Sequence, residues 1–208
     1  MKKTKRSKKS RSWIIKKHRD QFFKKSKVLG YKSRAAFKLI ELNKKFKFIK
    51  KNTNLLDIGC APGGWSQVAS QLIIDGKILA IDIKQMEKIK KVEFLKCDFL
   101  EEQSEDKILN FFSGKIDVII SDMAADTTGN KNLDCIRTNL LCVEVLHFSI
   151  KMLKQKGTVI SKVFMGEDFL AVKDLAKKNF KKVDFFKPES SKNESKETYM
   201  HCSLLKSL

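Results

Sequence analysis

The glycine-rich stretch at residues 55–65, LLDIGCAPGGW, constrains the fold of this chain more than any other feature. It has the pattern of a buried strand that ends in an acid, followed by a tight turn and the start of a helix. In open α/β proteins, this layout places backbone N–H groups and one carboxylate around a nucleotide-like ligand at the carboxyl end of a strand. The glycines at 59, 63 and 64 lack the G-x-G-x-x-G spacing of a dinucleotide-binding turn, and no G-x-x-x-x-G-K-[ST] phosphate loop is present.

The size and composition indicate one domain. A length of 208 residues and a hydrophobic content of 42% are enough for a single core. No run approaches the ~18 apolar residues that span a membrane, and the Lys-rich start lacks the apolar segment of a secretion signal, so we expect a cytoplasmic protein. The cysteines are odd in number and have no C-x-x-C spacing, which predicts reduced thiols and no metal site. They are Cys60, Cys97, Cys135, Cys142 and Cys202.

The positive charge is concentrated at the start of the chain. Residues 1–51 hold 21 Lys and Arg against two acids, whereas residues 52–208 hold 23 against 22, so nearly all of the net charge of +20 lies in the first quarter. Binding to a polyanion favours such clustering, because each neutralised phosphate releases condensed counterions. Nucleic acid is therefore the leading partner, and an anionic membrane surface is the second possibility.

Hydrophobic residues divide this basic region into two parts. Residues 1–10 contain almost only charged and small polar side chains and are expected to form a disordered tail. In residues 11–51, apolar and aromatic residues alternate with the basic ones, which indicates helices with one docked face and one exposed basic face. We expect residues 11–208 to form a single domain, with an RNA-binding helical part at 11–51 and a cofactor-binding core at 52–208.

The apolar periodicity predicts two helices followed by alternating strands and helices, which is typical of a mostly parallel, doubly wound α/β sheet. Ser33 is the expected N-cap of the second helix. The last two segments are joined by a polar loop alone, so they can pair directly and place one antiparallel strand at the end of the sheet. The expected helices are 13–25, 34–47, 64–74, 101–112, 133–153 and 167–179, and the expected strands are 53–58, 77–82, 92–96, 116–121, 157–164, 180–187 and 198–205.

An ionisable residue follows or ends each of the first five strands, where a doubly wound sheet binds its ligand. These residues are Asp57, Asp82, Asp98, Asp122 and Lys162. Asp82 lies at the usual place for a carboxylate that binds a ribose diol, which would suit NAD as well as S-adenosylmethionine (SAM). Asp98 could accept from an adenine amino group. Together with the D-x-G-x-x-x-G spacing of the turn, Asp98 favours SAM.

Several segments, taken in order, resemble the FtsJ/RlmE family of SAM-dependent ribosomal RNA ribose 2'-O-methyltransferases. The resemblance extends over nearly the whole chain after about residue 11. It implies a Rossmann-like methyltransferase fold with basic N-terminal helices. The segments are SRAAFKL at 33–39, DIGCAPGGWSQ at 57–67, SDMA at 121–124, KVFMGE at 162–167, KPESS at 187–191 and ETY at 197–199.

The resemblance also implies a site. The Lys-Asp-Lys-Glu tetrad of the family matches Lys38, Asp122, Lys162 and Glu197. The cofactor-binding residues expected from the turn and from the resemblance are Asp57, Gly59, Gly63, Gly64, Trp65, Asp82, Asp98 and Asp122. The implied substrate is ribosomal RNA of the large subunit, with an A-loop uridine of 23S rRNA as the target, and we expect a monomer.

Two roles remain open for Lys162 at this point. As a general base it must be neutral, which requires burial or a nearby lysine to lower its pKa from ~10.4. Asp122 would have the opposite effect and hold the ammonium as an orienting cation. In either role, the residues must align the sugar oxygen with the methyl group and manage the hydroxyl proton.

The alternatives fit the sequence less well. Enzymes that methylate base amino groups carry an Asn/Asp-Pro-Pro-aromatic segment after the fourth strand, and residues 121–124 have neither proline nor aromatic. Cytosine-C5 chemistry needs a cysteine in this segment, and none is there. The glycine spacing disfavours an NAD-dependent dehydrogenase. A tRNA ribose methyltransferase and a non-catalytic RNA-binding ribosome-assembly factor with the same fold remain as alternatives.

Overall fold

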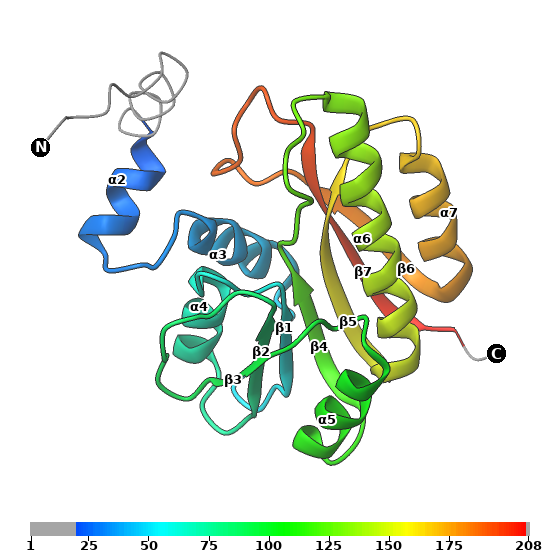
Figure 1. Ribbon diagram of the computed structural model, residues 1–208. Coiled ribbons are helices and arrows are strands. Elements are labelled where there is room, and N and C mark those ends of the chain that lie inside the picture. Colours follow the sequence, from blue (N-terminus) through cyan, green and yellow to red (C-terminus); the bar gives the residue numbers. More distant parts are fainter. Residues whose placement is uncertain (1–19, 207–208) are drawn as a thin grey trace, which may run out of the picture.

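The computed structural model describes residues 20–206, which form helices on both faces of one seven-stranded sheet (Figure 1). The strand order is β3-β2-β1-β4-β5-β7-β6. The strands are β1 (Leu55–Ile58), β2 (Ile78–Asp82), β3 (Glu93–Lys96), β4 (Ile116–Ser121), β5 (Leu153–Phe164), β6 (Phe180–Phe186) and β7 (Glu197–Leu205). The helices are α2 (Gln21–Val28), α3 (Ala35–Phe46), α4 (Gly64–Leu72), α5 (Glu102–Phe112), α6 (Lys131–Met152) and α7 (Phe169–Asn179).

The central strands are apolar along nearly their whole length because both faces of the sheet are covered. Side chains alternate between the faces, so Leu56 and Ile58 belong to one core while Leu55 belongs to the other. The first core lies under α5, α6 and α7, and the second lies under α3 and α4. The expected doubly wound α/β architecture is confirmed.

The end of the sheet contains the predicted antiparallel strand in an unexpected position. β7 pairs antiparallel with β5 on one side and with β6 on the other, so β6 forms the edge and β7 lies one strand inside it. The direct pairing of the last two segments is confirmed. β5 begins at Leu153, four residues before the predicted start, because Leu153 pairs with Ile116 across a register shift.

The N-terminal helices differ from the prediction at their ends. Asp20 caps α2, since its Oδ1 accepts from the backbone N–H groups of Phe22 (3.0 Å) and Phe23 (3.1 Å). Residues 13–19 of the predicted helix and the predicted tail at 1–10 lie outside the described residues. Ser33 does not cap α3, whose N-cap is Arg34. The Ser33 hydroxyl lies instead against Gly64, where α3 packs on the glycine-rich turn.

No helix within residues 20–206 combines the length and the apolar character needed to cross a bilayer. The longest helix, α6, has 22 residues but carries charged side chains along its length.

The core under α5 to α7 should contribute strongly to stability. Leu56 is fully buried in β1, so Leu56→Ala should lower the free energy of unfolding by about 2–5 kcal/mol through lost burial and a residual cavity. Urea unfolding followed by circular dichroism measures the change. The control is Leu140→Ala on α6, whose side chain is 56% exposed and which should change stability by about 0.5 kcal/mol or less. Equal losses in the two variants would contradict this core assignment.

Candidate active site

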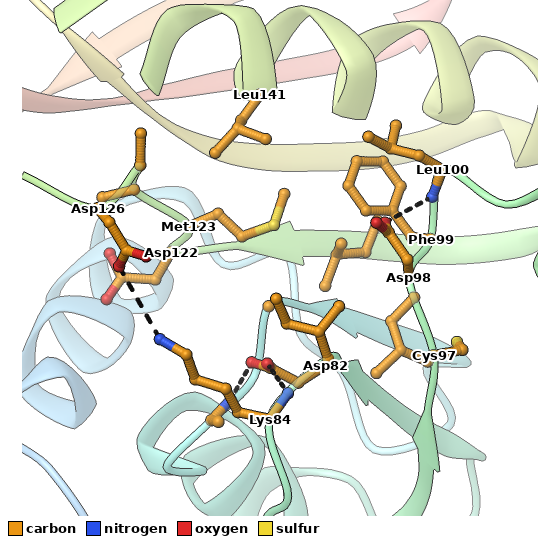
Figure 2. A pocket seen from close by; sticks show the side chains of 17 residues that line it. Asp82, Lys84, Cys97, Asp98, Phe99, Leu100, Asp122, Met123, Asp126 and Leu141 are labelled. Atoms are coloured by element: carbon orange, nitrogen blue, oxygen red, sulfur yellow. Dashed lines mark hydrogen bonds and ion pairs between the residues drawn. The ribbon is translucent and has the colours of Figure 1, made fainter. Parts of the chain in front are cut away.

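A cavity of about 340 Å³ opens at the carboxyl ends of β1, β2 and β4. Figure 2 shows Asp82 on one side of it and Met123 and Leu141 on the other. Its walls are largely apolar, and its polar groups are mostly carboxylates. The lining residues are Ile58, Gly59, Ala61, Ile81, Asp82, Ile83, Lys84, Cys97, Asp98, Phe99, Leu100, Asp122, Met123, Ala124, Ala125, Asp126 and Leu141.

Backbone N–H groups hold two of these carboxylates in place. Asp82 accepts from the N–H of Ala61 (2.8 Å) and of Lys84 (2.7 Å), and Asp98 accepts from the N–H of Leu100 (3.0 Å). A carboxylate has about four lone-pair sites, so both can accept further hydrogen bonds from a ligand. Apolar walls with two fixed acceptors fit an adenosine group, which presents a flat ring, an amino group and two ribose hydroxyls.

The glycine-rich turn bends the chain around this cavity. Gly59 and Gly63 have φ angles of +73° and +105°, which side chains rarely adopt. A Cβ on Gly59 would collide with Met123, and one on Gly63 would lie 2.8 Å from Ile89 Cδ1. Of these two glycines, Gly59 lines the cavity.

Three other predicted cofactor residues lie behind the turn. Gly63, Gly64 and Trp65 do not line the cavity, and they form the start of α4. The Trp65 indole is buried, donates to the Ala35 carbonyl of α3 (2.8 Å) and packs on Tyr199. These residues therefore connect the turn to α3.

Asp57, the acid of the strand that precedes the glycine-rich turn, also lies behind the cavity rather than on its surface. Its side chain is buried and accepts a hydrogen bond from the hydroxyl of Ser66 (2.5 Å). Burial raises the pKa of Asp57 to about 7, and the nearby charges of Asp122 and Asp82 act in the same direction. The carboxyl group thus tethers β1 to α4.

The four predicted catalytic residues converge beside the cavity. Lys162 Nζ lies 2.8 Å from Asp122 Oδ1 and 3.4 Å from Glu197 Oε2. Lys38 Nζ lies 2.7 Å from Glu197 Oε1 and 3.8 Å from Asp122 Oδ1. Each lysine therefore contacts both carboxylates. Of this tetrad of Lys38, Asp122, Lys162 and Glu197, Asp122 lines the cavity, so the tetrad reaches the cavity through this residue.

The tetrad is charged and self-neutralising. Burial alone would lower the pKa of Lys162, but Asp122 and Glu197 outweigh it and raise the pKa above its usual value. Burial would likewise raise the pKa of Asp122 and of Glu197, yet the two lysines hold both below their usual range. Lys162 also donates to the backbone carbonyl of Asp122 (2.8 Å), so its three N–H groups face three acceptors.

Two further residues, which the strand-end pattern does not predict, hold the tetrad in place. The Tyr199 hydroxyl donates to Asp122 Oδ1, and the Ser191 hydroxyl donates to Glu197 Oε1 (2.8 Å). Burial and the charge of Asp122 raise the pKa of Tyr199 well above its usual value, so it remains a donor. Ser191 belongs to the KPESS segment and Tyr199 to the ETY segment, and these two family-like segments are the sequence signal that points to both residues.

The polar loop between β6 and β7 is fastened to α3. Glu41 accepts from the backbone N–H groups of Glu189 (2.6 Å) and Ser190 (3.1 Å). Arg34 donates to the Ser190 carbonyl and forms an ion pair with Asp20. These contacts place Ser191 at Glu197 and join the N-terminal helices to the active site.

The buried thiols of Cys60 and Cys142 are unsuited to act as nucleophiles. All five cysteines are free thiols. Burial raises the pKa of Cys142 to about 12 and that of Cys60 further still, so neither forms a thiolate readily. Within residues 20–206, no group of three His, Cys, Asp or Glu side chains is arranged to hold a metal ion.

This sheet order, the cavity at the carboxyl ends of the strands and the two fixed carboxylates define a Rossmann-like methyltransferase, for which SAM is the methyl donor. The sequence profile of FtsJ-like methyltransferases matches residues 31–204. The chain therefore belongs to the FtsJ-like methyltransferase family.

Individual relatives support this membership. The chain is 43% identical to ribosomal RNA large subunit methyltransferase E of Pelagibacter ubique over 95% of its own length and 97% of the relative. A crystal structure described as a ribosomal RNA methyltransferase of Plasmodium falciparum superposes with a TM-score of 0.75 and 34% identity, over 84% of this chain and 98% of the other. Human methyltransferase-like protein 13 in complex with SAH shares the fold, with a TM-score of 0.57 and 16% identity, over 81% of this chain and 79% of that one.

The buried Asp57 should make stability depend on pH. Its folded pKa of about 7 lies above the unfolded value of 3.8, so its favourable contribution is complete below about pH 4 and is lost as the pH rises towards 7. The stability of the wild type relative to Asp57→Asn should therefore fall between pH 4.5 and 7.5. Urea unfolding at several pH values measures this difference, with Asp106→Asn on α5 as the exposed control. A wild-type advantage that grows with pH would contradict the assignment.

Proposed function

We propose that this protein transfers a methyl group from SAM to a ribose 2'-hydroxyl of large-subunit ribosomal RNA, with an A-loop uridine of 23S rRNA as the target. The observation that carries the proposal is the convergence of Lys38, Asp122, Lys162 and Glu197 at the rim of the donor cavity. The RNA class is supported by the names of the relatives in Pelagibacter and Plasmodium. We also propose that the protein acts in the cytoplasm as a monomer.

The cavity residues divide the binding of the donor among them. Asp82 accepts hydrogen bonds from the ribose hydroxyls, and Asp98 accepts one from the adenine amino group. Gly59 leaves room for the donor beside the turn, while Asp57, Gly63, Gly64 and Trp65 hold that turn in place. When bound, SAM supplies a methyl group on a positively charged sulfur, which makes it reactive towards a weak nucleophile such as a sugar hydroxyl.

Lys162 acts as an orienting cation in this proposal. Its raised pKa and its three acceptors favour the ammonium form, which cannot take up a proton. The ammonium fixes the position of Asp122. The Asp122 carboxylate would orient the 2'-hydroxyl and accept its proton when bound SAM supplies the methyl group. Lys38 and Glu197 hold this pair in place and keep the net charge of the tetrad near zero.

The geometry disfavours base methylation. The segment at 121–124 presents Asp122 and Met123 to the cavity and has no proline or aromatic residue against which a base could stack. C5 chemistry requires a nucleophilic cysteine, and the segment at 121–124 contains none.

Removal of Lys162 should affect the reaction rather than donor binding. Lys162→Ala should reduce the single-turnover rate by ~10²-fold or more, because both carboxylates lose an oriented cation, and should leave the SAM dissociation constant nearly unchanged. Lys162→Arg retains the charge and cannot act as a base, so it should be at least ~10-fold faster than Lys162→Ala. Lys107→Ala on α5 is the exposed control. A rate for Lys162→Arg as low as that of Lys162→Ala, with a wild-type rate that rises steadily above pH 9, would favour a general base instead.

Removal of Asp82 should have the opposite signature. Asp82→Ala should weaken SAM binding by ~10-fold or more, because ribose hydroxyls lose a charged acceptor in a partly enclosed cavity. Isothermal titration with SAM measures the change, and Asp75→Ala, which is remote from the cavity, is the control. Unchanged affinity in Asp82→Ala would place the ribose elsewhere.

Mapping of the product tests the proposed reaction directly. Tritiated SAM is incubated with the protein and with large subunits from a strain deficient in methylation. Alkaline hydrolysis then leaves a labelled dinucleotide if the methyl group is on a 2'-oxygen, because the neighbouring phosphodiester cannot be cleaved. Label recovered in single nucleotides would indicate a base, and label in tRNA alone would indicate the tRNA alternative.

A further inference from the structure

A second and larger hollow lies at the amino ends of the parallel strands, whereas the active site lies at their carboxyl ends. Its volume is about 780 Å³, compared with about 340 Å³ for the donor cavity. It is formed by the segments at the amino ends of β1, β4 and β5, by β6 and β7, and by the end of α3 with the turn that follows. Neither the tetrad nor the donor-binding carboxylates line it.

Six exposed lysines surround this hollow, which we term the basic groove. They are Lys45, Lys47, Lys50, Lys154, Lys156 and Lys182. Two carboxylates oppose them, and one of these, Asp117, is already engaged by Lys154 (2.7 Å) and by the N–H of Asn54 (3.0 Å). The groove therefore carries a clear positive excess.

The clustering of these six lysines does not follow from the basic N-terminal region alone. Residues 52–208 are almost neutral overall, yet three of their lysines meet here with three lysines from the strongly basic first 51 residues. Two regions of the sequence thus contribute equally to one positively charged surface.

The floor of the groove is uncharged at neutral pH. The His201 imidazole is buried and stacks on Phe46 with 4.2 Å between ring centroids, and its Nδ1 lies 3.5 Å from Asp184 Oδ2. Burial lowers the pKa of His201. The charge of Lys182 also lowers this pKa, while the hydrogen bond and charge of Asp184 raise it by less than these two effects together lower it. The positive charge consequently comes from the lysines alone.

Helix α3 connects the groove with the active site. Lys38 in its first turn belongs to the tetrad, and Lys45 near its end lines the groove. Seven residues at 1.5 Å each separate them by about 10 Å along the axis of the helix. A large folded polyanion can therefore contact both places on the same molecule.

We propose that the basic groove binds the phosphate backbone of the RNA substrate as a second contact, separate from the site of methyl transfer. This inference rests on the proposed function for the identity of the polyanion. Lysines are depleted from protein–protein interfaces, whereas phosphate contacts are made largely by lysine and arginine. Six lysines around an open, uncharged floor therefore favour a nucleic acid backbone over an acidic protein.

Neutralisation of the groove in the full-length protein tests the proposal. The variant Lys50→Gln/Lys156→Gln/Lys182→Gln removes three exposed lysines whose side chains form no hydrogen bond or ion pair with other residues in the described range 20–206. The matched control, Lys88→Gln/Lys107→Gln/Lys177→Gln, removes the same charge from exposed positions on other surfaces. Binding of large-subunit ribosomal RNA is measured at several KCl concentrations, together with SAM affinity and the rate of methyl transfer at saturating RNA.

The affinity of the groove variant for RNA should be lower by ~10-fold or more. The negative slope of log affinity against log salt should become shallower by about 2 relative to the wild type, because fewer phosphates are contacted. SAM affinity and the saturated rate should match the wild type, and the control should lose much less affinity. Equal losses in the two variants would overturn the proposal. So would wild-type RNA binding by the groove variant, which would leave an acidic protein as the candidate partner. Failure of the wild type to form 2'-O-methylated RNA would instead overturn the proposed function, independently of the groove.

Discussion

The mutual neutralisation of two lysines and two carboxylates away from water is the interaction on which this structure depends. A buried charge is costly unless it is paired, so each member of the tetrad requires the other three. Its members come from α3, from the residue that follows β4, and from β5 and β7, so the pairing ties α3 to this part of the sheet. The same pairing leaves Asp122 at the rim of the donor cavity with its charge retained.

The reversed direction of β7 explains how the fourth member reaches this site. Parallel strands bring their carboxyl ends to one edge, which places Asp122 after β4 and Lys162 near the end of β5. An antiparallel strand presents its first residues at that edge instead, and Glu197 at the start of β7 pairs with Phe164 at the end of β5. Tyr199, two residues later, faces the same side and reaches Asp122. The antiparallel strand thus supplies one member of the tetrad and a hydrogen-bond donor to another.

Much of this arrangement could be predicted from residue patterns, because apolar strands and the acids that follow them are local features. Asp82, Asp98, Asp122 and Lys162 were found by their positions at strand ends. Lys38 and Glu197 could not be found that way, since lysine and glutamate are abundant in this chain, and the family resemblance supplied them. Ser191 and Tyr199 were missed because their partners are defined only by tertiary packing. Tertiary packing likewise decides the positions of Trp65, which lies behind the turn, and of Ser33, which packs on Gly64 and does not cap α3.

The insertion of β7 between two strands that precede it has a consequence for biosynthesis. During translation, β5 and β6 emerge before the segment that must separate them, so their shared hydrogen-bonding partner does not yet exist. Domains otherwise tend to fold from the amino end as they are made. Here the sheet cannot close, and Glu197 cannot complete the charge pairing, until residue 205 has been synthesised.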